Sequence, residues 1–445
     1  HSTVAVGQQV EVAVGISRAD GVYIYDNDGK KILDSMSGLW CVNMGYGQQS
    51  IIDAVNEQMK ELVYYNNFFG SSHPSAIKLS EMIADKTPEG MNKVYFCGSG
   101  SEANDTVVRL VRHYWAARGN PSKSVIISHT NAYHGSTMAG ASLGGMSAMH
   151  SQGGLPIADI EHVEQPYYYD ACVEAGGKID ADEYGMKVAQ SLEKKIDELG
   201  EDRIAAFIAE PILASGGVIV PPKGYHKKTL EICRKYNVIY ISDEVVTGFG
   251  RLGHIMASEK YFDIVPDIIL MAKGITSGYV PCGAVVISEN LMADLDNKEK
   301  VIFSNGFTDS GHPVAMAAAS ATLDFIENNN LLDHVKKVAP YFQSKLAELI
   351  DLPIVGDVRG AGLMAAVECV IDKEKRDPLN LQYEIASRIN THCQNLGLIV
   401  RPLFNTCVMS PSLIIEESEI DELVRILREG IILATEDIKK EGLWS

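Results

Sequence analysis

The sequence has little positive charge and no long apolar run. Asp and Glu outnumber Lys and Arg by 58 to 39, so the formal net charge is −19 at pH 7. This acidity argues against a nucleic-acid partner, which needs a basic surface, and against binding to an anionic membrane. No stretch approaches the roughly 18 apolar residues of a membrane-spanning helix. We therefore expect neither partner, and any anionic ligand must be bound by a local group of donors.

Cysteine pairs and metal-binding patterns are also missing. The eight cysteines form no CxxC pair, and the chain is far longer than a disulfide-stapled scaffold. His113, His162 and His254 lack metal-binding spacing such as HxxxH, so we expect no metal site. Residues 1–10 do not have the basic and apolar regions of a secretory signal. Together these absences predict free thiols in a cytoplasmic protein.

The middle of the chain predicts an α/β fold. Short apolar strands alternate with helices between about residues 94 and 288, which is typical of a mostly parallel sheet with helices on both faces. The expected strands are residues 94–97, 124–128, 205–209, 238–242, 267–271 and 284–288, and the expected helices include residues 101–115 and 225–236.

The two ends of the chain predict a second, smaller α/β domain, as a length of 445 residues requires. Near the start, residues 21–33 alternate like a β-hairpin around an Asn-Asp-Gly turn. Near the end, we expect strands at 363–370 and 399–401 and amphipathic helices at 332–349 and 418–439, the last with Ser418 as N-cap. We therefore assign residues 1–44 and 310–445 to the small domain and residues 45–309 to the large one.

Reactive side chains follow the predicted strands, where ligands bind in parallel sheets. Asp243 ends one apolar strand and Lys273 follows the next. A lysine with apolar flanks is partly desolvated, and the resulting lower pKa suits Schiff-base chemistry. Singly, these residues are also compatible with a loop-capping acid and a solvated lysine. As a pair they match pyridoxal phosphate (PLP), which needs a lysine at its aldehyde and an acid at its ring nitrogen.

Two other strand ends complete this pattern. Residues 98–102 combine backbone N–H groups, two hydroxyls and a helix start, which suits a phosphate, although Ser99 or Ser101 can equally be a simple N-cap. Tyr133 and His134 follow the next strand. An aromatic ring at this point can stack on a pyridine ring or can pack in the core.

Several motifs in order resemble the class III (ω-) aminotransferases of PLP fold type I. They are FCGSGSEAND at 96–105, YHG at 133–135, EP at 210–211, GGVIVPPKGYHKK at 216–228, SDEVVTGFGRLG at 242–253, AKG at 272–274, GFTDSGHPVA at 306–315, DVRGAGLMAAVE at 357–368 and RP at 401–402. The resemblance covers nearly the whole chain. It implies a large PLP-binding domain with a mostly parallel seven-stranded sheet, and a smaller α/β domain built from both termini.

The resemblance also implies a role for each matching residue. Lys273 would carry the cofactor as a Schiff base and later move a proton, Asp243 would bind the pyridine nitrogen, and Glu210 would lie on the side of the 3-oxygen. The remaining cofactor contacts would be Ser99, Gly100 and Ser101 at the phosphate, Tyr133, His134 and Val245 at the ring, and Thr308 at the phosphate of the neighbouring subunit. The family is dimeric, so we expect a homodimer with shared sites.

Residues 39–47 and 65–70 resemble the subgroup that uses pyruvate. The implied substrate pocket contains Leu39, Trp40, Ser136, Ser215 and, from the partner chain, Phe69. Trp40 and Phe69 are equally compatible with plain core packing. Ser136 and Ser215 stand where several relatives have small apolar residues, which favours polar donors such as ω-amino acids or taurine. Arg401 would bind carboxylates through its guanidinium, although a structural arginine is the alternative.

These features predict a ping-pong transaminase. An ω-amino acid or primary amine would give its nitrogen to the cofactor, and a 2-oxo acid, expected to be pyruvate, would accept it. The same fold also hosts an aminomutase, a decarboxylase and phospho-amine lyases, and a PLP-binding protein without turnover is a further alternative. The donor stays open among β-alanine, taurine, γ-aminobutyrate, diamines and aryl amines.

Overall fold

The apolar strands of the middle of the chain form a seven-stranded sheet. The computed structural model describes residues 14–296, 302–373, 377–378 and 384–444. In sheet order, the strands are β4 (Met91–Cys97), β10 (Gly283–Ser288), β9 (Ile268–Met271), β8 (Ile239–Asp243), β7 (Ile204–Ala209), β5 (Val125–His129) and β6 (Ile160–Val163). Strand β10 is antiparallel to β4 and β9, and the other pairs are parallel. The prediction of a mostly parallel sheet is therefore confirmed, and six strands end at one edge.

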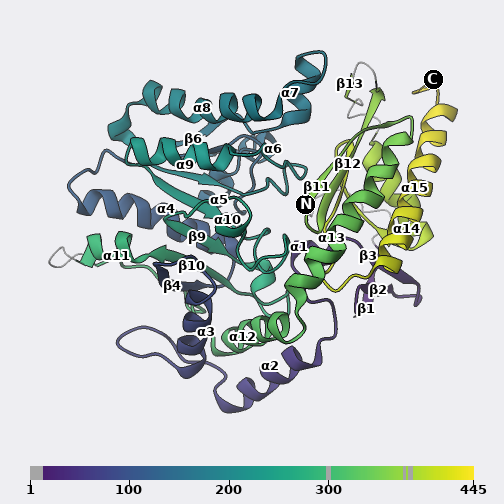
Figure 1. Ribbon diagram of the computed structural model, residues 1–445. Helices are drawn as coiled ribbons and strands as arrows, with labels where there is room; N and C mark the ends of the chain where they lie inside the picture. Colours follow the sequence, from purple (N-terminus) through teal and green to yellow (C-terminus); the bar gives the residue numbers. More distant parts are fainter. Residues whose placement is uncertain (1–13, 297–301, 374–376, 379–383, 445) are drawn as a thin grey trace.

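Helices cover both faces of this sheet because successive strand residues point to opposite sides. In β9, Ile268 and Leu270 pack with α4 (Gly100–Ala117), whereas Ile269 and Met271 belong to the core that contains α3 (Pro74–Ala84) and α12 (Pro313–Asn328). Figure 1 shows the layers. The other helices of this lobe are α2 (Gln49–Glu61), α5 (Met138–Leu143), α6 (Ser147–His150), α7 (Tyr168–Glu174), α8 (Ala181–Leu199), α9 (Tyr225–Lys235), α10 (Ala257–Lys260) and α11 (Glu289–Asp296).

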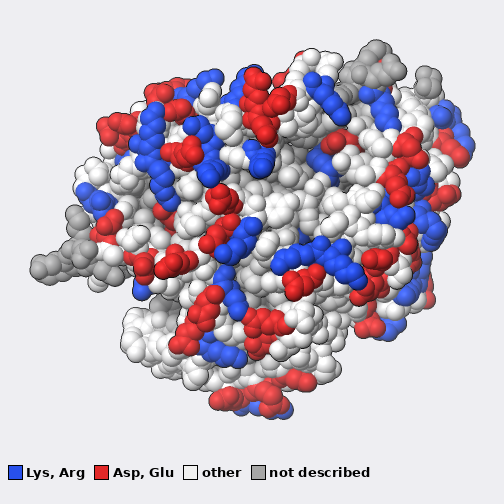
Figure 2. Space-filling view, viewed as in Figure 1, with Lys and Arg blue, Asp and Glu red and all other residues white. Residues whose placement is uncertain are grey.

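A smaller lobe lies beside the first (Figure 1). Its five-stranded sheet contains β11 (Val355–Ala361), β12 (Met364–Asp372), β16 (Thr406–Met409) and β15 (Arg401–Leu403), with β13 (Asp377–Pro378) paired to β12. Its helices are α13 (Leu331–Ala347), α14 (Ile385–Leu396) and α15 (Glu417–Lys440). Figure 2 shows charges of both signs mixed over one face of the molecule and a largely uncharged surface where the lobes meet.

The two ends of the chain meet in a four-stranded sheet. Strands β1 (Ile16–Asp20), β2 (Tyr23–Asp26) and β3 (Lys31–Asp34) form an antiparallel meander, and β14 (Leu398–Ile399) pairs in parallel with β3. The predicted hairpin is present, with β2 and β3 as its arms. Helix α12 contacts both α2 and α3 of the larger lobe. The division at residues 44/45 and 309/310 stays a prediction.

Some local expectations differ from the structure. Ser418 is not the N-cap of α15, because Glu416 takes that position and forms a reciprocal capping box with Glu419. Glutamate side chains can make both bonds that satisfy the first free N–H groups. The expectation about residues 1–10 lies outside the described residues. Within the described part of the chain, no helix is long and apolar enough to cross a membrane.

Candidate active site

A cavity of about 500 Å³ lies where the parallel strands end. Most of the predicted site residues line it: Leu39, Ser99, Gly100, Ser101, Tyr133, His134, Glu210, Ser215, Asp243, Val245 and Lys273. They come from segments up to 234 positions apart (273 − 39 = 234), and the sheet edge brings them together. The cavity is therefore built by the parallel topology, as expected for this class of sheet.

Asp243 ends β8 and is 4% exposed. Its carboxylate accepts hydrogen bonds from His134 Nδ1 at 2.7 Å, Val245 N at 3.1 Å and Asn104 Nδ2 at 3.3 Å. Burial acts to raise the pKa of Asp243, but these bonds and His134 outweigh it and hold that pKa below its ordinary value. Asp243 is thus a buried carboxylate that stays ionised at neutral pH.

Lys273 lies directly beyond β9, the neighbouring strand of β8. Burial lowers the pKa of its amine, and Asp243 and Glu210 partly offset this effect. Its backbone adopts a φ of +46°, a left-handed conformation that costs a non-glycine residue energy and that recurs at active sites. The fold therefore holds an amine of reduced basicity next to a carboxylate, the arrangement that a nucleophilic lysine needs.

Glu210 follows β7 and is 4% exposed. Its two carboxylate oxygens accept from Tyr133 N and Ala214 N, each at 3.0 Å. Burial raises the pKa of Glu210 to about 7. This side chain therefore connects the loop after β5 with the loop after β7.

The start of α4 faces the same cavity. Ser99 is the N-cap, with its Oγ accepting from Glu102 N, so the alternative capping role is present. Ser101 Oγ accepts from Ser136 N at 3.1 Å. A Cβ at Gly100 would lie 3.3 Å from Val245, so glycine lets the start of α4 pack closely against that side chain. The first N–H groups of a long helix here form an anion-binding end.

Asn104 was not predicted. It lies one turn after Gly100 on α4, where residues four apart share a face. Its Nδ2 bonds Asp243, while its Oδ1 is buried with no hydrogen-bond partner among the described residues. The signal in the sequence was its spacing, because Asn104 follows Gly100 of the glycine-serine turn by four positions. Cys41, Thr276 and Cys282 also line the cavity, and sequence reasoning had no signal for them.

These features fit PLP. The helix start suits its phosphate, Asp243 suits its ring nitrogen, and the Lys273 amine suits its aldehyde. The Oδ1 atom of Asn104 in the cavity wall has no hydrogen-bond partner among the described residues, so it is left for a ligand. Within the described residues, no group of three or more His, Cys, Asp or Glu side chains is arranged to hold a metal ion.

Other predicted residues lie outside the cavity lining. Trp40 is 2% exposed in an apolar cluster with Ile212, Ala214 and Val218, so in this chain it packs in the core. Ser136 bonds the Tyr133 hydroxyl at 3.0 Å. Arg401 lies next to the cavity, where its Nη1 donates to Ser215 Oγ at 3.5 Å.

Phe69 and Thr308 both lie away from the cavity of their own chain. The Phe69 side chain is 99% exposed. The Thr308 carbonyl accepts from the Tyr64 hydroxyl at 2.8 Å, and Asn67 Nδ2 bonds the carbonyls of Ser310 and Gly311. Residues 64–69 and 306–311 thus contact one another.

Comparison with known proteins gives consistent results. The family model for class III aminotransferases matches residues 4–431. The putrescine–pyruvate aminotransferase of Pseudomonas aeruginosa is 48% identical over 93% of this chain and 89% of its own. Gamma-aminobutyrate transaminase 1 of Oryza sativa is 39% identical over 95% of this chain and 81% of its own.

Solved structures agree with the sequence matches. A PMP-bound aminotransferase from Vibrio fluvialis superimposes with a TM-score of 0.91 at 36% identity, over 96% of this chain and 94% of that one. A PLP-bound amine transaminase from an uncultivated Pseudomonas species gives a TM-score of 0.90 at 35% identity, over 98% and 97%. The chain therefore belongs to the class III aminotransferases, PLP-dependent enzymes of fold type I.

Proposed function

We propose that this enzyme transfers the amino group of a primary amine, with an aliphatic diamine such as putrescine as the preferred donor, to pyruvate. The observation that carries the proposal is the pair at the ends of neighbouring strands, in which Lys273 has a lowered pKa and the buried Asp243 has a pKa below its ordinary value. The diamine preference is supported by the relative that is named for putrescine and pyruvate. The net charge of −19 also favours the approach of a dication.

Each residue of the site has a defined task. When bound, PLP supplies an aldehyde that condenses with amines and a ring that accepts the electron pair left by deprotonation. Asp243 would keep a proton on the ring nitrogen, because hydrogen bonds hold the pKa of its carboxyl below its ordinary value. Lys273 would remove a proton from the reacting carbon and return one to its neighbour, because a freed amine within reach can serve as base and then as acid. The start of α4 binds the phosphate.

The carboxylate of pyruvate needs a positively charged partner at the cavity, because the overall negative charge of the protein does not attract an anion. Arg401 is the candidate because it lies beside Ser215 at the cavity, and a guanidinium binds a carboxylate with two hydrogen bonds. The same residue favours ω-amino acids as a second donor class, since their carboxylates would bind there. A gamma-aminobutyrate transaminase among the relatives supports this second class.

We further propose a cytoplasmic homodimer with shared sites. Phe69 and Thr308 lie on one exposed surface away from their own cavity, and Val63 and Tyr65 add exposed apolar area beside Phe69. Such a patch is characteristic of an interface between chains. All eight cysteines are free, which supports a reducing compartment.

The test separates the two half-reactions. Putrescine added without an oxo acid should bleach the visible absorption of the bound cofactor, and pyruvate should restore it while one alanine forms per turnover. β-Alanine in place of putrescine measures the second donor class. Release of carbon dioxide, ammonia or phosphate would contradict transamination, and an unchanged spectrum with every amine would identify a binder without turnover.

A further inference from the structure

Two arginines, Arg359 and Arg401, lie in one cross-strand row of the sheet in the smaller lobe. Arg359 pairs with Ala366, Ala366 with Val408, and Val408 with Arg401. Residues paired directly across strands point to the same face. Ala366 and Val408 pack in the cluster that contains Ala214 and Val218 of the larger lobe, so this face is turned toward residues 214–218.

Both arginines contact the same turn of the larger lobe. Arg359 Nε donates to the Gly217 carbonyl at 2.9 Å, and Arg401 Nη1 donates to Ser215 Oγ at 3.5 Å. Gly217 has a φ of +110°, and a Cβ there would lie 3.1 Å from Arg359 Nη2, so the turn approaches this guanidinium closely. Ser215 lines the active-site cavity. The turn therefore connects Arg359 to the cavity.

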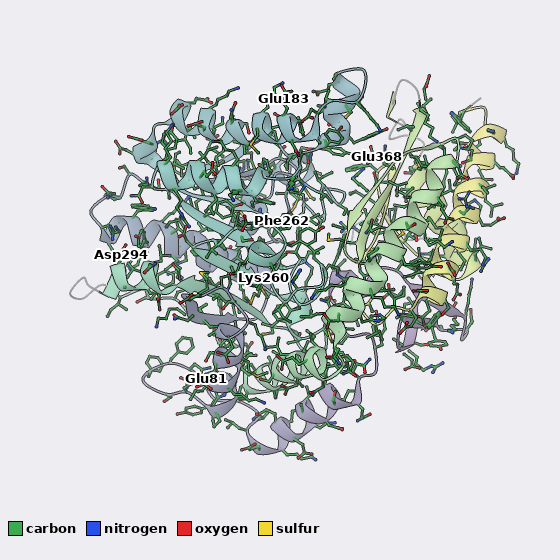
Figure 3. All side chains as sticks on the ribbon, viewed as in Figure 1. Glu81, Glu183, Lys260, Phe262, Asp294 and Glu368 are labelled. Atoms are coloured by element: carbon green, nitrogen blue, oxygen red, sulfur yellow. The ribbon has the colours of Figure 1, made fainter. Side chains whose placement is uncertain are left out.

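Arg359 is held firmly by charged and aromatic partners. Its Nη1 donates to Asp357 at 2.8 Å and to Glu368 at 2.7 Å. The Tyr167 hydroxyl, from the larger lobe, donates to Glu368, and the Tyr167 ring lies 4.8 Å from the guanidinium carbon. Figure 3 shows Glu368 on the side of the smaller lobe that faces the larger one. Tyr167 thereby clamps the two lobes at this point.

Arg401 is held loosely by comparison. Its Nε is buried with no hydrogen-bond partner, and it forms no ion pair among the described residues. Burial lowers the pKa of Arg401, whereas Tyr167, Glu368 and Asp357 outweigh the effect of burial at Arg359 and raise its pKa. A half-buried guanidinium whose Nε has no partner can bind an acceptor. Arg359 is therefore fixed by its partners, whereas Arg401 has a donor left for a ligand.

We propose that Arg359 is a positioning residue that, with Glu368 and Tyr167, fixes the turn at 214–217 so that Ser215 places Arg401 for the carboxylate of the amino acceptor. This inference rests on the role proposed above for Arg401. It also gives a function to Tyr167 and to the DVRGAGLMAAVE motif at 357–368. The affinity for carboxylates would then depend on residues that never touch the substrate.

The experiment measures the calorimetric dissociation constant of propionate, a carboxylate without a reactive carbonyl, for the holoenzyme. Arg359→Lys keeps the positive charge but loses the planar guanidinium, which donates to Asp357, Glu368 and the Gly217 carbonyl. We expect about fivefold weaker propionate binding, corresponding to the loss of one or two hydrogen bonds. In an Arg401→Ala background the same change should have less than about a twofold effect, because coupled residues are not additive.

Tyr167→Phe and Tyr168→Phe form a matched pair. The Tyr168 hydroxyl donates to the Ile179 carbonyl within the larger lobe, so its loss should leave propionate binding unchanged. Tyr167→Phe should weaken it by about threefold. The putrescine half-reaction, measured without oxo acid, should stay within about twofold of the wild-type rate in both variants.

Three results would overturn the inference. One is a lower melting temperature of Arg359→Lys with unaltered propionate binding, which indicates a structural role only. Another is an equal loss of affinity in the wild-type and Arg401→Ala backgrounds, because Arg359 then acts independently of Arg401. The third is an Arg401→Ala enzyme that binds propionate normally. That outcome would show that Arg401 does not bind the carboxylate. Failure of the proposed transamination would appear differently, as a cofactor absorption that no amine bleaches.

Discussion

His134 and Asp243 form a buried pair in which Nδ1 of the imidazole lies 2.7 Å from Oδ2 of the carboxylate. With Nδ1 donating to Asp243, His134 Nε2 accepts from Ser128 Oγ at 3.1 Å. The pair joins the loop after β5 to the end of β8. It keeps a negative charge inside the protein next to Lys273, and the charge has hydrogen-bond donors to compensate for its burial.

Replacement of Asp243 by Asn should preserve cofactor binding but remove most of the rate. An amide cannot keep a proton on the ring nitrogen, so the electron pair left by deprotonation is no longer stabilised. We expect a fall in kcat of about 100-fold or more. Steady-state kinetics and the cofactor content after dialysis test this together. A variant with kcat near wild type would contradict the assignment of Asp243.

Lys273→Ala should abolish detectable turnover, since the amine is both the point of cofactor attachment and the proton carrier. Cofactor binding through the phosphate should persist, and equilibrium dialysis will measure it. Lys260→Ala is the matched control because Lys260 is a surface residue, labelled in Figure 3, whose side chain is 63% exposed. Its kinetics should be those of the wild type. Substantial turnover by the Lys273→Ala enzyme would exclude Lys273 as the catalytic base.

Arg401→Ala should raise the KM of pyruvate by about 10- to 100-fold, the effect of losing charged hydrogen bonds to a carboxylate. The half-reaction with putrescine should change by less than about twofold, because a diamine has no carboxylate. Arg428→Ala, which removes an arginine paired with Asp351 on the surface, serves as the control. Equal effects on pyruvate and putrescine would assign Arg401 a structural role.

Glu210 should make the cofactor-free enzyme less stable as the pH rises. Burial raises the pKa of Glu210 to about 7, whereas an unfolded chain has the ordinary value of about 4.5. The folded state therefore binds the proton more tightly, and its stabilising effect is full below about pH 4.5 and is lost as the pH rises to about 7. Melting temperatures of wild type and Glu210→Gln from pH 4.5 to 8 test this. If both enzymes show the same pH profile, Glu210 is not the group responsible.

Phe69→Asp should weaken subunit association, because it places a charge on the proposed interface. Sedimentation velocity at several protein concentrations should show a larger monomer fraction for this variant. Phe404→Asp is the control, since Phe404 is also exposed, at 67%, but lies on the smaller lobe. A Phe69→Asp enzyme that sediments as the wild type does would exclude Phe69 from the interface.

The amino-acid sequence was sufficient to predict most strands of the central sheet, although the edge strand β6 was not among the expected strands. Strands such as β8 and β9 are continuous apolar runs buried on both faces, and this is a local property that a sequence displays directly. The positions of Asp243 and Lys273 follow from where these runs end. The rule that ligands bind at the carboxyl ends of parallel strands then predicts one shared site.

Only the tertiary structure decided which distant side chains meet. Pairing of β14 with β3, burial of Trp40 in a core cluster, and the contact of Arg359 with Gly217 all join segments more than 100 positions apart. No local periodicity encodes such contacts, because they depend on how segments far apart in the chain pack against one another. The sequence by itself therefore determined the reactive groups and their class of chemistry. Tertiary packing determined the burial that shifts the pKa values of Lys273 and Glu210. It also brought Arg359 and Arg401 to the same turn of the larger lobe.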